Sequence, residues 1–562
     1  MKFSEIPYTR VDLDRAVSEG KRLVERAMAA KSGPEQVQIH QEFNRLCGHV
    51  RTVRLIASIR RDGDMTDPFY EKENEYYDQE LPRFQAVQTE YRKAILGAPY
   101  RAYLEEQIGP VPFASMELAA KSFDEKLVPL IQEENRLITR YSRRIASAAI
   151  EWEGETLNLS LLGKYMKSPD RQTRKRAWEK YGAFFEAYRE ELDEIYDGLV
   201  KNRTLQARML GYENYVELGY YRQNRNSYGR EQVEKLRQQV KEVYVPFAEQ
   251  MHERRRQRLG LEHLYYYDEG VYFPEGNPVP TGSAEEILAA GERMYTSLSD
   301  ETGRFFRMMR ERELFDVLGR KHKKAGGYME ELPDYKVPFI YANFNGTSGD
   351  VDVITHECGH AFQYYVAAED PVMDHYSYMT METAEIHSMS MEFFTEPWME
   401  LFFGERGGDY RKMHLEDAIA FVPYGCMVDE FQHIVYGNPD LTPGQRREAW
   451  KELERVYRPH MDPTGSAFLE NGGFWQKQLH IFEVPFYYID YVIAQLCAFQ
   501  YRIKMEQDYP AAWESYLKLC RLSGSKFYPE LMKEAGLQVP FEESCIRRIT
   551  EALDPLIRPI RR

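Results

Sequence analysis

The sequence predicts a mainly α-helical protein with a small β-sheet. Long stretches are rich in Glu, Lys, Arg, Leu, Ala and Gln, and apolar residues within them recur at three- and four-residue steps, whereas strand-like segments are few. With 562 residues, 43 % of them hydrophobic, the chain can bury a large core. No repeat or clear linker divides it. We therefore expect a single helical body over 1–562, with an N-terminal part at 1–160 and a second part at 161–562.

The first helix that the sequence marks clearly begins near Ser168. Ser168 can cap a helix, Pro169 suits the first helical position, and Asp170 favours the positive helix end. Aromatic and apolar residues then follow at helical spacing as far as Tyr188, which gives the helix an apolar face. A second long helix is predicted over about 230–258.

Strands are predicted at only two places. Val337–Asn345 is the stronger candidate, because it is rich in β-branched and aromatic residues and ends at Gly346. Tyr265–Tyr272 is the weaker candidate. The sheet is therefore expected to be small.

Composition excludes several classes of protein and favours a cytoplasmic one. The net charge of −16 argues against a broad electrostatic grip on nucleic acid or anionic lipid. The N-terminal residues show no apolar secretory core, and no uncharged apolar run is long enough to cross a membrane. The six cysteines are scattered and none forms a C-x-x-C pair, a pattern typical of reduced thiols. We expect no nucleic-acid or membrane partner.

The pattern that carries chemistry is His356-Glu357-Cys358-Gly359-His360. Residues four apart lie on one face of a helix, so both imidazoles can reach one tetrahedral zinc ion at about 2.0–2.1 Å. Glu357 is one step further round and can accept a proton from a zinc-bound water. A chance match on a surface helix competes with this interpretation, but it is expected in only on the order of a few per cent of chains this long.

A catalytic zinc takes three protein ligands and keeps one position open, so a third ligand is needed. A segment about 20 to 30 residues further on offers Glu382, Glu385, His387 and Glu392. On a helix the three glutamates share one face and His387 points elsewhere, but spacing alone does not choose among the four. Asp352, one turn before the motif, is a candidate partner for a ligand imidazole or, equally, a helix N-cap.

The motif, followed 25 residues after His360 by Glu385 in Glu-Ile-His-Ser, resembles the thimet oligopeptidase and oligoendopeptidase F family of zinc metallopeptidases. It is most similar to the bacterial branch of Pz-peptidases and oligoendopeptidase F. The resemblance implies one zinc per chain, with His356, His360 and Glu385 as ligands. It also implies that Glu392 supports the site, which then lies within 356–392.

The resemblance extends upstream through Ser168–Lys175 and Leu210–Tyr215 and covers about 160–500. It implies a two-lobed, zincin-type helical shell with a deep channel and a small sheet beside the zinc. Such a channel would admit short unfolded peptides, so the expected activity is zinc-dependent endopeptidase cleavage of oligopeptides. The strand ending at Asn345 would lie along the cleft and bind the peptide through an exposed edge, and Gly346 would leave room for the peptide backbone.

Downstream, the segment from His480 to Tyr491 resembles the His-and-Tyr segment of the same family. There the His and two tyrosines three apart face the scissile peptide, and Tyr488 and Tyr491 keep that step. Such groups could donate hydrogen bonds to an oxyanion. A register that uses Tyr487 stays open, and an aromatic core stripe is the alternative in a chain with 41 tyrosines.

Two other functions compete. A zinc carboxypeptidase or peptidyl-dipeptidase on a related helical fold would need a cationic clamp for the substrate's C-terminal carboxylate, and the sequence singles out no arginine for it. A binding protein with a structural zinc is disfavoured because Glu357 is present and a structural site usually fills its fourth position. The sequence does not specify the oligomeric state.

Overall fold

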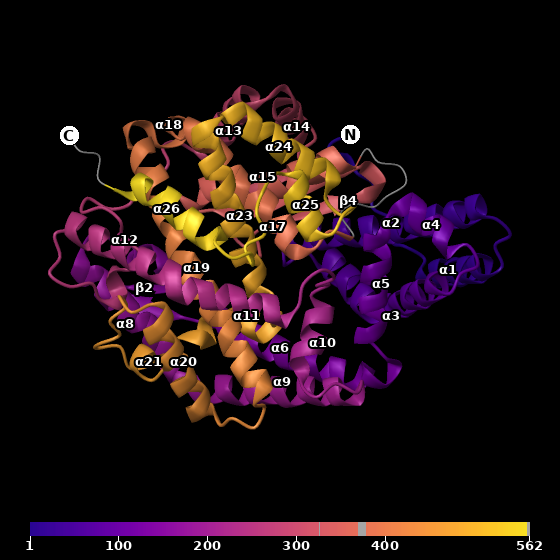
Figure 1. Cartoon of the computed structure of the whole chain (residues 1–562), viewed down its shortest axis with the longest axis horizontal. Helices are drawn as coiled ribbons and strands as arrows, with labels where there is room; N and C mark the ends of the chain where they lie inside the picture. The colour runs from indigo at the N-terminus through magenta and orange to yellow at the C-terminus, as the bar shows by residue number, and fades with distance from the viewer. Residues whose placement is uncertain (325, 369–377, 559–562) are drawn as a thin grey trace. The chain divides into compact units, whose positions relative to one another are not determined.

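The computed structural model describes residues 1–324, 326–368 and 378–558, and it is mostly helical, as the sequence predicts (Figure 1). The chain forms two compact units, each built from three separate segments. The boundary expected near residue 160 falls inside unit 2. Unit 1 comprises residues 1–120, 279–407 and 504–537, and unit 2 comprises residues 121–278, 408–503 and 538–562.

Unit 1 contains helices from all three of its segments. The first three long helices, α1, α2 and α3, pack on one another around a buried cluster in which the rings of Phe43 and Tyr91 stack 3.6 Å apart. A small sheet packs against α15 and α2. The α-helices are α1 (Leu13–Met28), α2 (Gly33–Gly63), α3 (Pro68–Leu96), α4 (Arg101–Ile108), α5 (Pro110–Ser122), α13 (Ala284–Leu298), α14 (Asp300–Glu311), α15 (Gly349–Ala367), α17 (Met381–Thr395), α18 (Glu400–Phe403), α24 (Tyr509–Leu522) and α25 (Tyr528–Glu534).

The sheet of unit 1 has the order β3-β5-β4, with β3 at Phe315–Leu318, β4 at Tyr328–Leu332 and β5 at Val337–Phe344. β5 confirms the stronger strand prediction. It runs parallel to β3 and antiparallel to β4. β4 pairs with Val337–Tyr341 and β3 with Ile340–Phe344, so the end of β5 at Ala342–Phe344 pairs with β3 alone among the described strands. The expectation that this end offers an edge to a peptide stays a prediction.

Unit 2 is built from helices and one short hairpin. The hairpin strands are β1 (Ile150–Trp152) and β2 (Glu155–Leu157), which pair antiparallel. The α-helices are α6 (Val128–Ala146), α7 (Leu159–Met166), α8 (Arg171–Ala187), α9 (Arg189–Met209), α10 (Tyr215–Arg222), α11 (Arg230–Gln239), α12 (Val245–Arg258), α19 (Gly407–Gly437), α20 (Pro443–Tyr457), α21 (Ala467–Glu470), α22 (Leu479–Glu483), α23 (Tyr488–Gln507) and α26 (Cys545–Ile557).

The two predicted helices form, with local differences. The first, α8, begins two residues later than predicted, because the carboxylate of Asp170 accepts the N–H of Thr173 and so provides the N-cap. The helix predicted over 230–258 is α11 and α12 joined by a π-turn at Val240–Tyr244. Pro246 follows that turn and lacks the N–H that would complete the α-helical ladder.

The weaker strand prediction, Tyr265–Tyr272, is wrong. The segment contains a 3₁₀ turn at Tyr266–Asp268 instead. The carboxylate of Asp268 accepts the N–H of Tyr265 at 3.0 Å and is also bonded to Arg171 and Arg174. This local side-chain bond offers the backbone an alternative to a sheet ladder.

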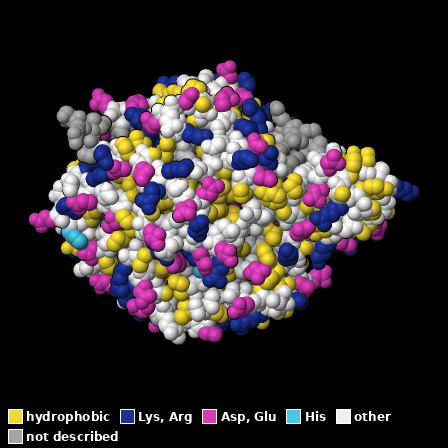
Figure 2. Space-filling model, in the orientation of Figure 1, with side chains coloured by type: hydrophobic (Ala, Val, Ile, Leu, Met, Phe, Trp, Pro, Cys, Tyr) yellow, Lys and Arg dark blue, Asp and Glu magenta, His cyan; other side chains and the backbone are white. Residues whose placement is uncertain are grey.

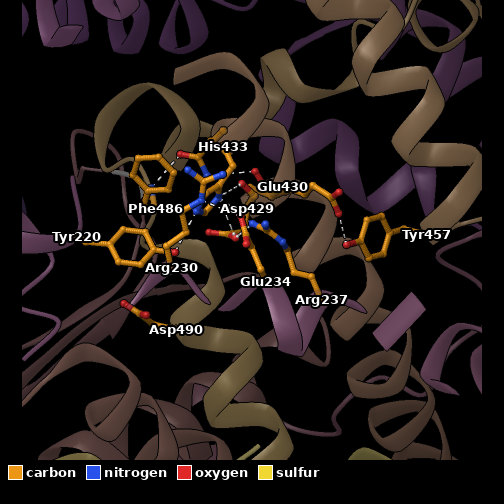
Figure 3. Close-up of polar contacts among 12 residues, drawn as sticks. Tyr220, Arg230, Glu234, Arg237, Asp429, Glu430, His433, Tyr457, Phe486 and Asp490 are labelled. Carbon is orange, nitrogen blue, oxygen red and sulfur yellow. Dashed lines mark hydrogen bonds and ion pairs between the residues drawn. The ribbon is translucent and has the colours of Figure 1, made fainter. Parts of the chain in front are cut away.

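A buried group of polar side chains joins α10, α11 and α19 in unit 2 (Figure 3). Arg237 donates to the carboxylate of Asp429 and lies 2.8 Å from Nδ1 of His433, whose Nε2 lies 3.0 Å from the Tyr220 hydroxyl. Burial raises the pKa of Asp429, but the charges of His433 and Arg237 outweigh it and bring the pKa to about 2. The negative charge is therefore retained deep in unit 2.

The distribution of surface charge and the state of the cysteines match what the composition predicts. Figure 2 shows basic and acidic side chains interspersed on the visible face rather than gathered into one basic field. All six cysteines are free thiols. Within the described residues, none of the helices combines the length and the apolar character that crossing a membrane requires.

Candidate metal centre

Two helices of unit 1, α15 and α17, position the candidate metal ligands. The motif histidines lie on α15, which packs on α17 and on β5. Gly359 lies where the two helices come closest. A Cβ atom at this position would lie 2.5 Å from Cα of Ser388 and 2.7 Å from the carbonyl oxygen of His387. Only glycine allows this approach, so Gly359 sets how close α17 comes to the two histidines.

His356, His360 and Glu385 form a group whose ligand atoms all lie within 4.8 Å of one another. Nε2 of His356 is 3.5 Å from Oε2 of Glu385, and Nε2 of His360 is 3.6 Å from the same oxygen. Two donors at tetrahedral positions 2.0–2.1 Å from one ion lie about 3.3–3.4 Å apart, so the spacing suits zinc. The histidine side chains are 26 % and 15 % exposed, which leaves access for water.

Glu392 fixes the orientation of one histidine. Its Oε1 lies 2.6 Å from Nδ1 of His356, so the ring donates its Nδ1–H to the carboxylate and leaves Nε2 to face the group. A carboxylate in this position orients a ligand imidazole and increases its basicity. Glu392 lies seven residues after Glu385 on α17, and that step places both carboxylates toward α15.

The group favours a positive charge at its centre. Burial lowers the pKa of His356, but its hydrogen bonds to Glu385 and Glu392 outweigh burial and raise the pKa well above 6.5. Burial raises the pKa of Glu385, but the imidazoles of His360 and His356 outweigh burial and lower it well below 4.5. A buried and a half-buried carboxylate beside two imidazoles thus attract a proton or a divalent cation.

The other third-ligand candidates have different partners. Glu382 accepts a hydrogen bond from the Thr380 hydroxyl at 2.6 Å. His387 is fully buried, and its Nε2 lies 2.6 Å from the Ser523 hydroxyl. Neither belongs to the group that gathers around the motif histidines, although all four candidates lie on α17.

Glu357 and Asp352 both lie on α15 and are half-buried. Glu357 lies beside His356 without belonging to the three-residue group. Asp352 lies in the first turn of the helix, which begins at Gly349, so the alternative that Asp352 is the N-cap is wrong. In this structure the carboxylate on Nδ1 of His356 comes from Glu392.

The turn between β5 and α15 contains Asn345 and Gly346. Asp350, which the sequence did not single out, accepts the N–H of Asn345 at 2.9 Å and that of Gly346 at 2.8 Å. Burial raises the pKa of Asp350, and these two bonds lower it in part. Gly346 has φ +79°, and nothing lies within 4 Å of where its Cβ would be. The backbone conformation, rather than crowding, therefore requires glycine here.

The predicted His-and-Tyr segment lies in unit 2, where its side chains form one cluster. The ring of His480 lies 5.0 Å from that of Tyr488 and 5.9 Å from that of Tyr491. Tyr487 also belongs to the cluster, 5.7 Å from His480 and 4.8 Å from Tyr491. Burial raises the pKa of Tyr488, so its phenol stays protonated. Both registers of the tyrosine pair thus bring a phenol next to His480.

A clamp that the sequence did not reveal holds the start of α23, which carries Tyr488. Asp490 is fully buried and bonded to Arg225 at 2.8 Å and to the Tyr228 hydroxyl at 3.1 Å. Arg225 also donates to the carbonyl of Phe486, which has φ +67°, a left-handed conformation that is uncommon for an aromatic residue. The clamp compensates the cost of this turn and fixes where α23 begins.

A second group of potential ligands in unit 2 fits a metal poorly. Glu249, His252 and His460 come within 4.8 Å, but the two imidazoles stack 3.5 Å apart with 19° between their planes. Lone pairs lie in the ring planes, so stacked rings cannot both direct one at the same ion. Both nitrogens of His460 are already bonded, to Glu249 and Glu269. We interpret this group as a buried ion network.

A mostly helical chain in which an H-E-x-x-H helix meets a carboxylate from a neighbouring helix has the candidate metal centre of a metallopeptidase. Comparison with known protein families identifies the family of metallopeptidases. The chain belongs to peptidase family M3: residues 164–276 and 291–551 match the model of that family, and residues 3–123 match the peptidase M3 N-terminal domain. The match therefore includes residues 3–123, which lie outside the span of about 160–500 that the sequence resemblance covers.

Individual relatives agree with this assignment. The chain is 45 % identical to a structure named Pz peptidase A with an inhibitor, with 99 % of each chain covered and a TM-score of 0.94. It is also 45 % identical to an X-ray structure provisionally assigned as oligoendopeptidase F, covering 100 % of this chain and 99 % of that one, with a TM-score of 0.95. Among curated proteins, it is 22 % identical to oligopeptidase PepF of Bacillus subtilis over 70 % of this chain. That match spans 58 % of the relative's length, and one to an oligoendopeptidase F homolog of Borreliella burgdorferi spans 50 %.

Proposed function

We propose that this protein is a zinc-dependent endopeptidase that hydrolyses internal peptide bonds of short unfolded oligopeptides. The observation that carries the proposal is the convergence of His356, His360 and Glu385, with Glu392 on the far nitrogen of His356. Membership of family M3 and the name of the inhibitor-bound relative support it. The proposal includes intracellular peptide turnover in the cytoplasm as the role of the enzyme.

His356, His360 and Glu385 would hold one zinc ion, through Oε2 of Glu385 and the two histidine Nε2 atoms, which lie 3.5 and 3.6 Å from that oxygen. When bound, zinc supplies a Lewis acid that polarises a peptide carbonyl and acidifies water. The remaining chemistry falls to residues of the chain. Glu357 accepts a proton from the attacking water and delivers it to the leaving amine. Glu392 keeps the His356 ring in the orientation that leaves Nε2 available.

We assign the oxyanion donors to the cluster in unit 2. His480, Tyr488 and Tyr491 are proposed to donate hydrogen bonds to the oxygen that becomes negative in the transition state. The raised pKa of Tyr488 supports this role, because a phenolate could not donate. Tyr487 stays the alternative to Tyr488, since its ring lies beside Tyr491 in the same cluster.

Peptide binding is proposed to use main-chain groups near the sheet. The end of β5 at Ala342–Phe344, which pairs with β3 alone among the described strands, is proposed to lie along an extended peptide and bind it through main-chain hydrogen bonds. The turn at Asn345 and Gly346 is proposed to contact the peptide next to it. Asp350 already accepts both N–H groups of this turn, and Oδ1 of Asn345 accepts two hydrogen bonds from Thr347. The turn would therefore offer a peptide its carbonyl oxygens and the side-chain nitrogen of Asn345.

The decisive experiment is Glu357→Gln, assayed with an internally quenched peptide and with metal analysis of the same sample. We expect a loss of activity of roughly 10²- to 10⁴-fold, the range for removing a general base, with about one zinc retained per chain. Glu311→Gln on the exposed face of α14 is the matched control and should leave both readouts unchanged. Full activity of Glu357→Gln would overturn the mechanism.

Two further measurements separate the alternatives. Glu385→Ala should weaken zinc binding, and unchanged affinity would transfer the third ligand to Glu382 or His387. A peptide with an amidated C-terminus should still be cleaved, because an endopeptidase does not need the terminal carboxylate. Loss of cleavage on amidation would favour a carboxypeptidase or peptidyl-dipeptidase.

A further inference from the structure

The side chain of Gln478 bridges two residues of the cluster in unit 2. Gln478 precedes α22 as its N-cap residue and is almost fully buried. Its Oε1 accepts a hydrogen bond from the Tyr424 hydroxyl at 2.8 Å, and its Nε2 lies 2.8 Å from Nδ1 of His480. Both ends of the carboxamide are therefore bonded within one small group.

These contacts determine which nitrogen of His480 carries the proton. In this orientation of the carboxamide its nitrogen faces His480, and because an amide nitrogen donates and cannot accept, Nδ1 of His480 accepts the hydrogen bond from Gln478. A neutral imidazole then carries its proton on Nε2. His480 needs this tautomer to donate a hydrogen bond to an oxyanion, because the donating Nε2–H lies on the side of the ring away from Gln478.

Tyr424, which donates to Gln478, is itself held in place by its neighbours. The ring of Tyr424 makes edge-to-face contacts with Trp450, Phe474 and Tyr488, whose ring centres lie 6.4, 6.1 and 5.8 Å away. The cations of Arg458 and Lys477 lie over the Tyr424 ring, at 5.5 and 5.3 Å from its centre. One ring thus packs against Tyr488 and, through the amide, orients His480.

We infer that Gln478, supported by Tyr424, is a positioning residue that holds His480 as the Nδ1-acceptor, Nε2–H-donor tautomer. This inference rests on the proposed role of His480 as an oxyanion donor. The titratable groups that face His480 among the described contacts are the phenols of Tyr487, Tyr488 and Tyr491. The hydrogen bond from Gln478 to Nδ1 is the contact that orients the ring in this inference.

The test compares Gln478→Leu with Gln478→Glu. Leucine removes the bridge, and we expect kcat to fall about tenfold with KM unchanged, a part of the 10²- to 10³-fold that a whole oxyanion donor contributes. Glutamate keeps the size, but as a carboxylate it only accepts, so Nδ1 must then carry the proton. Nε2 can donate only while the ring is an imidazolium, and we expect kcat near the wild-type value at low pH with a new descending limb as pH rises.

A structural readout accompanies the kinetics. With ¹⁵N-histidine labelling, and His480→Ala to identify the signals, wild-type His480 should show a lone pair on Nδ1 and a proton on Nε2. Gln478→Glu should reverse the two. Tyr424→Phe, which removes only the hydroxyl, should lower kcat by a smaller factor, and Gln172→Leu, at an exposed position on α8, is the control expected to change nothing.

The outcomes separate this inference from the proposed function. If His480→Ala lowers kcat while both Gln478 variants keep the wild-type pH profile and the wild-type tautomer, the inference alone is wrong. If His480→Ala is fully active, the role of His480 in the proposed function is wrong and the inference falls with it. The comparison requires that each variant melts within a few degrees of the wild type. If Gln478→Leu misfolds, Tyr424→Phe takes its place in the test.

Discussion

The close approach at Gly359 makes Gly359→Ala a sensitive test of the candidate metal centre. Carbon atoms in contact normally lie about 3.5–4.0 Å apart, but the new Cβ would lie 2.5 Å from Cα of Ser388. The obstacle is backbone, so no side-chain rotation relieves it, and α17 must move by about 1 Å or more. Glu385 lies one turn before Ser388 on the same helix and must move with it.

Two effects of Gly359→Ala oppose each other. Alanine favours a helix over glycine by about 1 kcal/mol, whereas overpacking costs about 1–3 kcal/mol, so the free energy of unfolding should fall modestly. The larger effect should be on zinc. A shift of about 1 Å spoils a tetrahedral site that tolerates about 0.2 Å, so we expect affinity to fall by at least tenfold.

Competition with a chromogenic chelator measures the zinc affinity, and chemical denaturation measures the stability. Gly163→Ala is the matched control, because Gly163 lies within α7 with nothing within 4 Å of its Cβ position. The control should be neutral or stabilising and bind zinc normally. If Gly359→Ala bound zinc as tightly as the wild type, the argument that this glycine sets the position of Glu385 would be refuted.

Three other variants test separate parts of the structure. Glu392→Gln should weaken zinc binding about 10- to 100-fold through the orientation of His356, and unchanged affinity in the same chelator assay would count against that role. Burial lowers the pKa of His40 to about 4 from about 6.5, so its contribution to stability is present above pH 6.5 and is lost as pH falls. The free energy of unfolding should be about 2 kcal/mol lower at pH 5 than at pH 7. If His40→Gln kept the same pH dependence of stability, another group would be responsible. Asp429→Asn leaves Arg237 buried without its counter-charge and should cost about 3–5 kcal/mol by urea unfolding, a value that a near-neutral result would contradict.

The sequence predicts best what local spacing determines. The helical class and the placement of His356 and His360 on one face follow from periodicity, and strand β5 follows from its β-branched and aromatic composition. The choice of Glu385 over Glu382 and His387 came from family resemblance, because it depends on where the helix α17 packs. Gly359 was the sequence signal of that packing, but a glycine does not reveal which backbone approaches it.

Other features depend on contacts between residues far apart in the chain. Asp350 and Gln478 carry no motif, and their importance appears only once their partners are folded beside them. The hairpin of β1 and β2 was missed, although Glu153 and Gly154 at its turn both have positive φ and the flanking apolar residues alternate.

The division of each unit among three separate segments has a consequence for how the protein is made. Unit 1 lacks its last helices until residues 504–537 have been synthesised, and α24 from that stretch packs directly on α15. The helix that carries both motif histidines therefore leaves the ribosome long before its covering helix exists. We expect the nascent chain to expose apolar surface during that interval and to depend on chaperones, and we expect truncation near residue 500 to yield aggregates rather than a folded half.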